Sequence, residues 1–140
     1  MTAPAFMPVE GRMAAYLLQP SAVTVGGIAR LTYRVEDPYV ATFEFARIEV
    51  QVSRLALAAG RHAYAVVDVD LAVAPCPSDA RWTYLIINSD AGSAQVAMPT
   101  ARLSEFLDAT FNVVAAGDED LHAPLPSDDE WDAWLYEVTS

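Results

Sequence analysis

The sequence predicts an α+β domain in which a curved antiparallel β-sheet carries one main helix. Most apolar stretches alternate with polar residues and are separated by short turn sequences, as hairpin-connected strands require. One late segment instead spaces its apolar residues at helical intervals: Leu103, Phe106, Leu107, Thr110 and Phe111. These residues form a single stripe along one face of a helix. A chain of 140 residues is long enough for one domain with a hydrophobic core.

The first third of the chain is expected to contain two strands. Residues 1–11 are interpreted as a flexible leader, and residues 13–19 as the first strand. The glycines of residues 25–27 predict a turn. Residues 29–35 then alternate apolar and polar side chains, which is typical of a half-buried strand. The dipeptide Asp37-Pro38 ends this strand.

Two more strands and a short helix are expected next. Residues 40–45 and 48–52 are predicted strands, and their apolar phase slips by one residue between them. The slip predicts a turn or bulge near Ala46-Arg47. Residues 53–59 then form a short helical stretch, which Gly60 is expected to close as a C-cap.

The second half of the chain leads into the main helix. Residues 64–73 are predicted to form one long strand, which Pro75 and Pro77 end because a central strand does not tolerate proline. Residues 82–99 are interpreted as a strand, a turn and a second strand. Pro99 lies where the main helix begins, because its missing N–H would be unpaired there anyway.

Charge is distributed unevenly along the chain. The net charge is −11, and all eight positive residues are arginines. Residues 118–140 contain eight acidic residues and no arginine, so most of the excess negative charge lies in this tail. Such a molecule is repelled by nucleic-acid phosphates and by anionic lipid surfaces. Its charge favours contact with a basic protein surface.

The composition also bears on the compartment. Cys76 is the only cysteine, so the chain has no internal disulfide, which fits a reducing cytoplasm. The N-terminal residues have no basic residue before Arg12 and are broken by prolines, unlike a signal peptide. The apolar stretches are too short to span a bilayer. We therefore expect a cytoplasmic protein without direct membrane insertion.

The acidic tail contains a predicted amphipathic helix. Ser127 and Glu130 form a capping box at its start. Residues 128–138 would then place four apolar side chains on one face: Trp131, Trp134, Leu135 and Val138. A free helix of this length is marginal in water, so it is expected to form only when docked. Two alternatives remain open, namely docking on its own body or a neighbouring protomer, and binding to a groove of another protein.

No group of residues predicts catalysis, a cofactor or a metal site. Asp68 and Asp70 share a predicted strand face, but no third ligand accompanies them, which favours a solvated face. Cys76 and His62 lack the third group that would position a catalytic base. Two histidines, His62 and His122, and one cysteine are too few for a zinc site.

Arg30 and Arg34 are candidates for contact with nucleic acid. They share a predicted strand face with Thr32, and a stripe of this kind is typical of nucleic-acid binding. The strongly negative net charge favours the other interpretation, in which these arginines pair across strands with acids such as Asp68 or Asp70.

Four segments also follow one another in the order found in a known family. Residues 37–43 are DPYVATF, residues 52–60 are VSRLALAAG, residues 70–75 are DLAVAP, and residues 88–107 contain NSDAGSA and then MPTARLSEFL. Together they resemble the SsgA-like proteins, the small sporulation and cell-division regulators of actinomycetes. Leu55 stands where the family has an aspartate, which is typical of a divergent member.

The resemblance implies a fold and an assembly. It implies a compact barrel-like core similar to the Whirly nucleic-acid-binding fold, assembled as a homotrimer. With it, the chain divides into the leader 1–11, an SsgA-like domain 12–117 and the acidic tail 118–140. It also implies that Arg54, which matches the family's arginine, pairs with an acid or caps backbone carbonyls.

The resemblance further implies a function. It points to a non-catalytic adaptor of sporulation-specific division, which recruits or localises the tubulin-like protein FtsZ at septa, directly or through a sibling protein. The candidate partner-binding residues are Asp37, Pro38, Tyr39, Trp131, Trp134 and Leu135. The alternative is a single-stranded nucleic-acid-binding protein of Whirly-like fold, which the charge disfavours.

Overall fold

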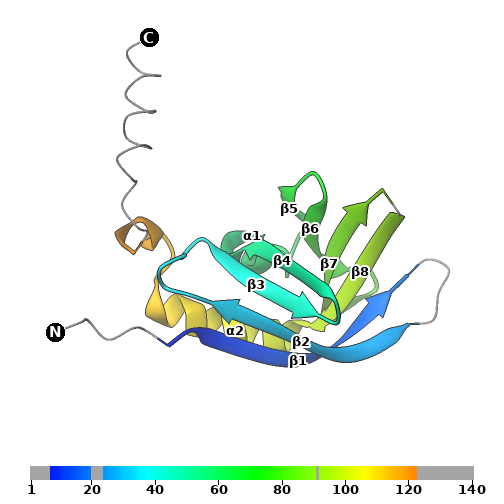
Figure 1. Ribbon diagram of the computed structural model, residues 1–140, viewed down its shortest axis with the longest axis horizontal. Coiled ribbons are helices and arrows are strands. Elements are labelled where there is room, and N and C mark those ends of the chain that lie inside the picture. The colour runs from blue at the N-terminus through cyan, green and yellow to red at the C-terminus, as the bar shows by residue number, and fades with distance from the viewer. Residues whose placement is uncertain (1–6, 20–23, 91, 123–140) are drawn as a thin grey trace, which may run out of the picture.

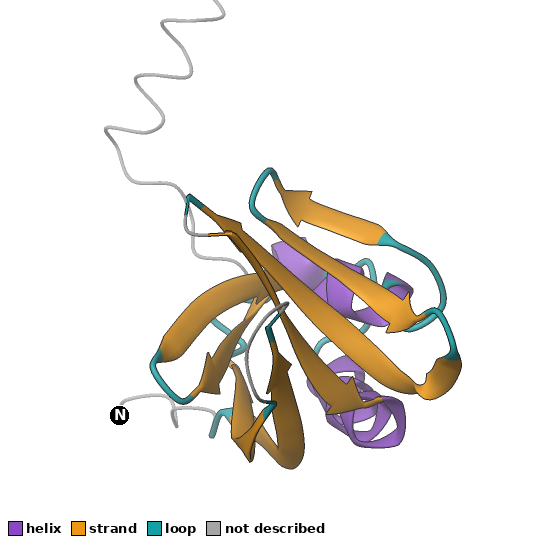
Figure 2. Cartoon of the chain, turned by 90° about the vertical axis from the view of Figure 1, so that its right-hand side faces the viewer, coloured by secondary structure: helices purple, strands orange, loops and turns teal. Residues whose placement is uncertain are grey.

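The computed structural model describes residues 7–19, 24–90 and 92–122. Within them, eight strands form one antiparallel sheet in the order β4-β3-β2-β1-β8-β7-β6-β5. The strands are β1 (Val9–Leu18), β2 (Val25–Tyr33), β3 (Val40–Phe45), β4 (Ile48–Ser53), β5 (Ala65–Asp68), β6 (Leu71–Cys76), β7 (Asp79–Ser89) and β8 (Gly92–Pro99). The sheet curls into a nearly closed, barrel-like shape around helix α2 (Thr100–Val113), as Figures 1 and 2 show. The predicted α+β class is confirmed.

The core lies on the inner side of the curled sheet. Alternate residues of β1, β2 and β3 are buried there, including Leu31, Tyr33 and Phe43. Helix α2 adds four of the five residues of the predicted stripe: Leu103, Phe106, Leu107 and Thr110. Phe111, the fifth, is half-buried. Helix α2 follows Pro99 directly, as expected from the sequence.

A short helix, α1 (Arg54–Ala59), lies between the two edge strands. It follows β4, and it packs against β4, β5, β6 and α2. The unpaired edge of a sheet is exposed to non-native pairing unless another element covers it. Helix α1 therefore both covers the edges and completes the enclosure of the core.

Helix α1 begins after Ser53 and, as predicted, ends at Gly60, but Gly60 is required for close packing and not for a left-handed conformation. The Ser53 Oγ accepts a hydrogen bond from the Ala56 N–H at 3.2 Å and caps the helix. Gly60 ends the helix with φ −65°, a conformation open to any residue. A Cβ at Gly60 would overlap the Val73 side chain, so close packing requires the glycine there.

The turn expected at residues 25–27 is absent, because these residues begin β2 and pair with β1. A Cβ on Gly26 would lie 3.2 Å from the Tyr16 ring, and one on Gly27 would lie 3.0 Å from the Phe45 ring. These glycines therefore make room for aromatic rings from other strands.

The leader and the long strand also need correction. Strand β1 begins at Val9, so residues 9–11 pair with β2 and do not belong to a leader. The predicted strand over residues 64–73 is a hairpin of β5 and β6. Its turn is stabilised by a hydrogen bond of 2.8 Å from the Asp70 N–H to the Asp68 Oδ1. Apolar and polar residues continue to alternate through this tight turn, so the sequence pattern does not reveal it.

The sequence also predicts a turn at Ala46-Arg47 and a strand end at Pro75. The predicted turn at Ala46-Arg47 is present, and Ala46 adopts a left-handed conformation with φ 52°. Pro75, expected to end a strand, lies within β6 beside a register irregularity between Pro75 and Cys76. Proline is tolerated at such an irregularity.

Candidate functional site

The Asp37–Tyr39 turn lies between β2 and β3, and its backbone is held by hydrogen bonds from buried residues. Pro38 is buried, whereas Asp37 is exposed and Tyr39 is 44% exposed. The buried Tyr33 hydroxyl donates a hydrogen bond of 2.9 Å to the Pro38 carbonyl. Burial raises the pKa of Tyr33, which keeps this hydroxyl a donor. Of the three turn residues, Asp37 and Tyr39 can therefore reach a partner, whereas Pro38 faces the interior.

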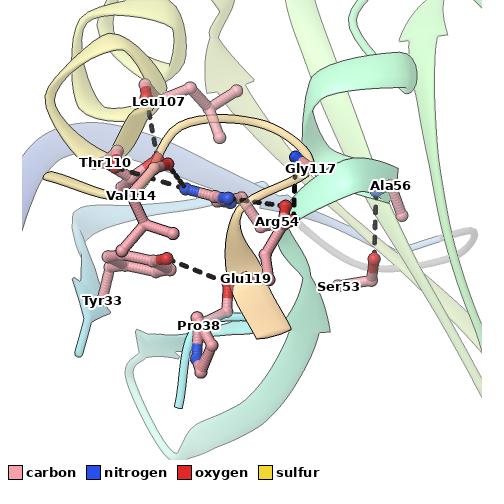
Figure 3. Close-up of polar contacts among 10 residues, drawn as sticks. All are labelled: Tyr33, Pro38, Ser53, Arg54, Ala56, Leu107, Thr110, Val114, Gly117 and Glu119. Carbon is pink, nitrogen blue, oxygen red and sulfur yellow. Dashed lines mark hydrogen bonds and ion pairs between the residues drawn. The ribbon is translucent and has the colours of Figure 1, made fainter. Parts of the chain in front are cut away.

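Arg54 supports the same turn from the start of α1. Its backbone N–H donates to the Tyr39 carbonyl at 2.8 Å. Its side chain is 1% exposed. The guanidinium donates to the Thr110 carbonyl at 3.2 Å and to the Val114 carbonyl at 2.7 Å, both at the C-terminal end of α2 (Figure 3). Because the last carbonyls of a helix lack intrahelical partners, this side chain acts as a C-cap for α2.

The charge of Arg54 is balanced by Glu119, which lies in the short 3₁₀ helix η1 (Glu119–Leu121). The guanidinium Nη2 lies 2.7 Å from the Glu119 Oε1, and both side chains are buried. Glu119 also accepts a hydrogen bond from the Gly117 N–H at 2.9 Å. The hydrogen bond from Arg54 lowers the pKa of this carboxyl. The family resemblance implied that Arg54 pairs with an acid or caps backbone carbonyls, and the structure shows that it does both.

Aromatic rings surround the same guanidinium. Its central carbon lies 4.3 Å from the centroid of the Phe111 ring and 5.0 Å from that of the Tyr33 ring. Such cation–π contacts are strongest where water is excluded. The Arg54 Nε has no hydrogen-bond partner within the described part of the chain.

The ion pair also changes the predicted boundary between the domain 12–117 and the tail 118–140. Glu119 was assigned to the acidic tail 118–140, but it is buried against the body. A buried guanidinium requires a paired charge, and Glu119 supplies it. The compact body therefore extends through η1. Trp131, Trp134 and Leu135, and the predicted helix that carries them, lie outside the described residues.

The polar residues of the strands do not form the ligand or phosphate sites considered above; they pair with a neighbouring strand or face solvent. Arg30 pairs with Glu44, its direct neighbour on β3, through contacts of 2.9 and 3.0 Å. The expected partners Asp68 and Asp70 are instead exposed at the β5–β6 turn. They do not share a strand face, because the chain reverses between them. No group of three potential metal ligands occurs in residues 7–19, 24–90 and 92–122.

Cys76 lies half-buried at the end of β6. Its sulfur is 3.5 Å from the Ser78 Oγ. Hydrogen bonds from the Ser78 and Tyr84 hydroxyls lower its pKa to about 7. Backbone hydrogen bonds at Ser78 and Asp79 act in the same direction, and His62, the candidate base, is not among the groups that hydrogen-bond to the sulfur.

The sequence did not identify two features of the molecule, which lie at opposite ends of α2. One is Glu119 as the partner of Arg54, 65 residues away. The apolar neighbours of Arg54 in α1 were the available signal, because they predict a buried arginine that needs a counter-charge. The other is a hollow lined by residues from β1, β2, β7, β8 and α2, which no local pattern marks. Within the described residues, no helix is both long and apolar enough to cross a membrane.

The fold defines a small α+β domain with a nearly closed antiparallel sheet, and the same architecture occurs in solved structures. One is SsgB from Streptomyces coelicolor, whose mutations correlate to longitudinal cell division during sporulation. It is 27% identical with a TM-score of 0.74, over 86% of this chain and 99% of that one. Another is an SsgA-like sporulation-specific cell division protein from Thermobifida fusca. It is 26% identical with a TM-score of 0.75, over 98% of this chain and 99% of that one.

Sequence comparisons agree with the structural ones. The family model described as Streptomyces sporulation and cell division protein SsgA matches residues 28–119. The sporulation-specific cell division protein SsgB of Saccharopolyspora erythraea is 34% identical over 110 residues, which is 75% of this chain and 77% of that protein. The chain belongs to the SsgA family of sporulation and cell-division proteins.

Proposed function

We propose that this protein is a non-catalytic adaptor of sporulation-specific cell division, which localises or recruits FtsZ at division septa. Contact with FtsZ is either direct or made through another family member. Family membership supports the division role. The observation that carries the adaptor mechanism is the Asp37–Tyr39 turn, whose backbone is anchored by Tyr33 and Arg54 while Asp37 and Tyr39 face solvent. A preorganised surface loop loses little conformational entropy when it binds a partner.

The proposed contact surface includes Asp37 and Tyr39, with Pro38 holding their conformation. The tail residues Trp131, Trp134 and Leu135 are proposed as a second contact. The net charge of −11 fits a basic protein surface as the partner. The proposed assembly is a homotrimer in the cytoplasm, which would present several copies of the turn at once and raise avidity.

The alternative function, single-stranded nucleic-acid binding, has less support. Arg30, the candidate for phosphate contact, has its charge balanced by Glu44, both of whose carboxylate oxygens accept hydrogen bonds from the Arg30 Nη2. Affinity for nucleic acid comes largely from unpaired positive charge along a groove.

Co-sedimentation with polymerising FtsZ from an actinomycete tests the proposal. We expect the full chain to pellet with the polymers, and the double substitution Asp37→Ala with Tyr39→Ala to reduce the pelleted fraction several-fold. Tyr64→Ala is the matched control, because Tyr64 is also exposed but lies before β5. A second comparison uses the chain ending at His122, which keeps Glu119 and hence the Arg54 ion pair.

The outcomes separate the versions of the proposal. Equal loss in the Tyr64 control would remove the turn from the contact surface. If the full chain fails to pellet alone but pellets when another family member is added, recruitment is indirect. Failure in both conditions would contradict the adaptor role.

A further inference from the structure

Two adjoining hollows lie on the surface where β8 leads into α2. They share Pro99 and Ala101 and have volumes of about 530 and 710 Å³. The first is also lined by Arg81 and Trp82, and the second by Arg12, Met13, Ala14, Ile28 and Arg102. Volumes of this size accept large side chains, since ligand sites range from roughly 300 to 1,000 Å³. We refer to the two hollows together as the α2 groove.

The α2 groove combines an apolar floor with a positive rim. Its rim carries three of the eight arginines, Arg12, Arg81 and Arg102, and no acidic residue lines it within the described part of the chain. Arg81 and Arg102 have carboxylate neighbours, Asp79 at 2.9 Å and Glu105 at 3.2 Å. Pairs this exposed are weak. Both arginines therefore remain able to attract a further negative charge.

Arg12 strengthens the positive character of the rim. Its direct neighbour across β1 and β2 is Arg30, another arginine. Like charges in this position are unfavourable. Arg30 is neutralised from its other side by Glu44, whereas Arg12 faces the groove. An acidic segment in the groove would relieve this repulsion.

The sequence beyond the described residues has the complementary pattern. In a helix over residues 128–138, Trp131, Trp134 and Leu135 share one face. At 3.6 residues per turn, two acids flank each side of that face: Asp128 and Asp132 on one side, Glu130 and Glu137 on the other. Aromatic anchors with acids on both flanks match an apolar floor between arginines.

The length of chain after His122 is sufficient to reach the groove. Figure 1 shows η1 near the C-terminal end of α2, and the α2 groove lies at the N-terminal end of that helix. Helix α2 has 14 residues, so the two ends are separated by about 20 Å. If residues 123–127 were extended and residues 128–134 helical, Trp131 could lie up to about 23 Å and Trp134 up to about 27 Å along the chain from His122.

We propose that residues 127–138 dock in the α2 groove of the same chain, with Trp131 and Trp134 against Trp82 and Pro99. The acids of the segment then face Arg12, Arg81 and Arg102. This docking describes the free protein, and it does not depend on the function proposed above. A partner that binds the tail would have to release it from the groove.

Amide hydrogen exchange of the full chain tests the proposal, with protection of residues 127–138 as the measured quantity. We expect protection in the wild type that is independent of protein concentration and reduced at least tenfold in Ala101→Glu. This change puts a carboxylate into the groove but suits the first turn of a helix, so α2 should remain folded. The control is Ala63→Glu, a change of the same kind at an exposed position outside the groove.

A second comparison reverses charge. The double substitution Arg81→Glu with Arg102→Glu should remove the protection, whereas Arg47→Glu, at the exposed β3–β4 turn, should not. Absence of protection in the wild type, or protection that survives Ala101→Glu, would overturn the proposal. Protection that appears only at high concentration, together with a larger mass in solution, would also overturn it and assign the groove to the tail of a second copy.

Discussion

Arg54 is the residue on which the candidate surface depends. A buried guanidinium is costly unless its charge and its donors are paired. Here one side chain contacts the end of α2 and the carboxylate of η1, and its backbone holds Tyr39. Arg54 therefore couples the exposed turn to the core, beside the hydrogen bond from Tyr33 to the Pro38 carbonyl.

Replacing Arg54 should destabilise the whole domain. Arg54→Met leaves the Val114 carbonyl and the Glu119 carboxylate without their donor, so we expect a loss of roughly 3–5 kcal/mol in the free energy of unfolding. Urea denaturation measures this quantity. Arg47→Met changes an exposed arginine and should alter stability by no more than about 0.5 kcal/mol. Similar losses for both variants would show that the buried ion pair contributes little.

Glu119 should make stability depend on acidic pH. Its pKa is lower in the folded chain than in the unfolded chain, so the unfolded state binds more protons between the two values. The stabilisation is complete above the ordinary glutamate pKa of about 4.3, and it is lost as pH falls through the folded value. The stability difference between wild type and Glu119→Gln should therefore shrink as pH falls below about 4. Thermal unfolding at pH 7, 5, 4 and 3 measures it, and a difference that stays constant would contradict the assignment.

At the scale of elements, close packing decides features that local propensity does not. Helix α1 approaches β6 so closely that only a glycine fits at residue 60. The same logic explains Gly26 and Gly27, which belong to a strand although glycine is uncommon there. In each case the constraint comes from a side chain on another element.

The substitution Gly60→Ala therefore distinguishes packing from propensity, because the two predict changes of opposite sign in the free energy of unfolding. At an ordinary helical φ, alanine should stabilise by about 0.5–1 kcal/mol through unfolded-state entropy alone. The overlap with Val73 predicts the opposite, a loss of about 1–3 kcal/mol. Urea denaturation distinguishes the two. In the double variant with Val73→Ala, the cost of Gly60→Ala should fall only in part, because the overlap with the Val73 Cγ1 is removed but the overlaps with the residue 73 Cβ and the Ala56 carbonyl remain.

At the scale of the whole molecule, the net charge of −11 favours some classes of partner over others. In the described body, Arg54 forms a buried ion pair, and Arg30, Arg81 and Arg102 form more exposed ones. The tail adds further negative charge. Long-range attraction is therefore expected toward basic proteins, and repulsion toward nucleic acids.

The full chain should consequently leave single-stranded DNA unshifted in a gel at low salt. Low ionic strength exaggerates any phosphate binding, so this is the most sensitive condition for the rival function. A shift that disappears as salt is raised would instead support the nucleic-acid-binding alternative. The chain ending at His122 shows whether the tail alone prevents binding.

The sequence by itself determined the α+β class, most strands, the short helix α1 and the main helix α2. These follow from period-two and period-3.6 patterns, caps and prolines, all of which act over a few residues. Through the family resemblance it also identified the Asp37–Tyr39 segment and the structural role of Arg54. Only the tertiary structure decided that Glu119 neutralises Arg54, that Pro38 faces inward, and that three arginines gather around Trp82. Such pairings join residues far apart in the chain, and they depend on the register and curvature of the sheet, which no local pattern encodes.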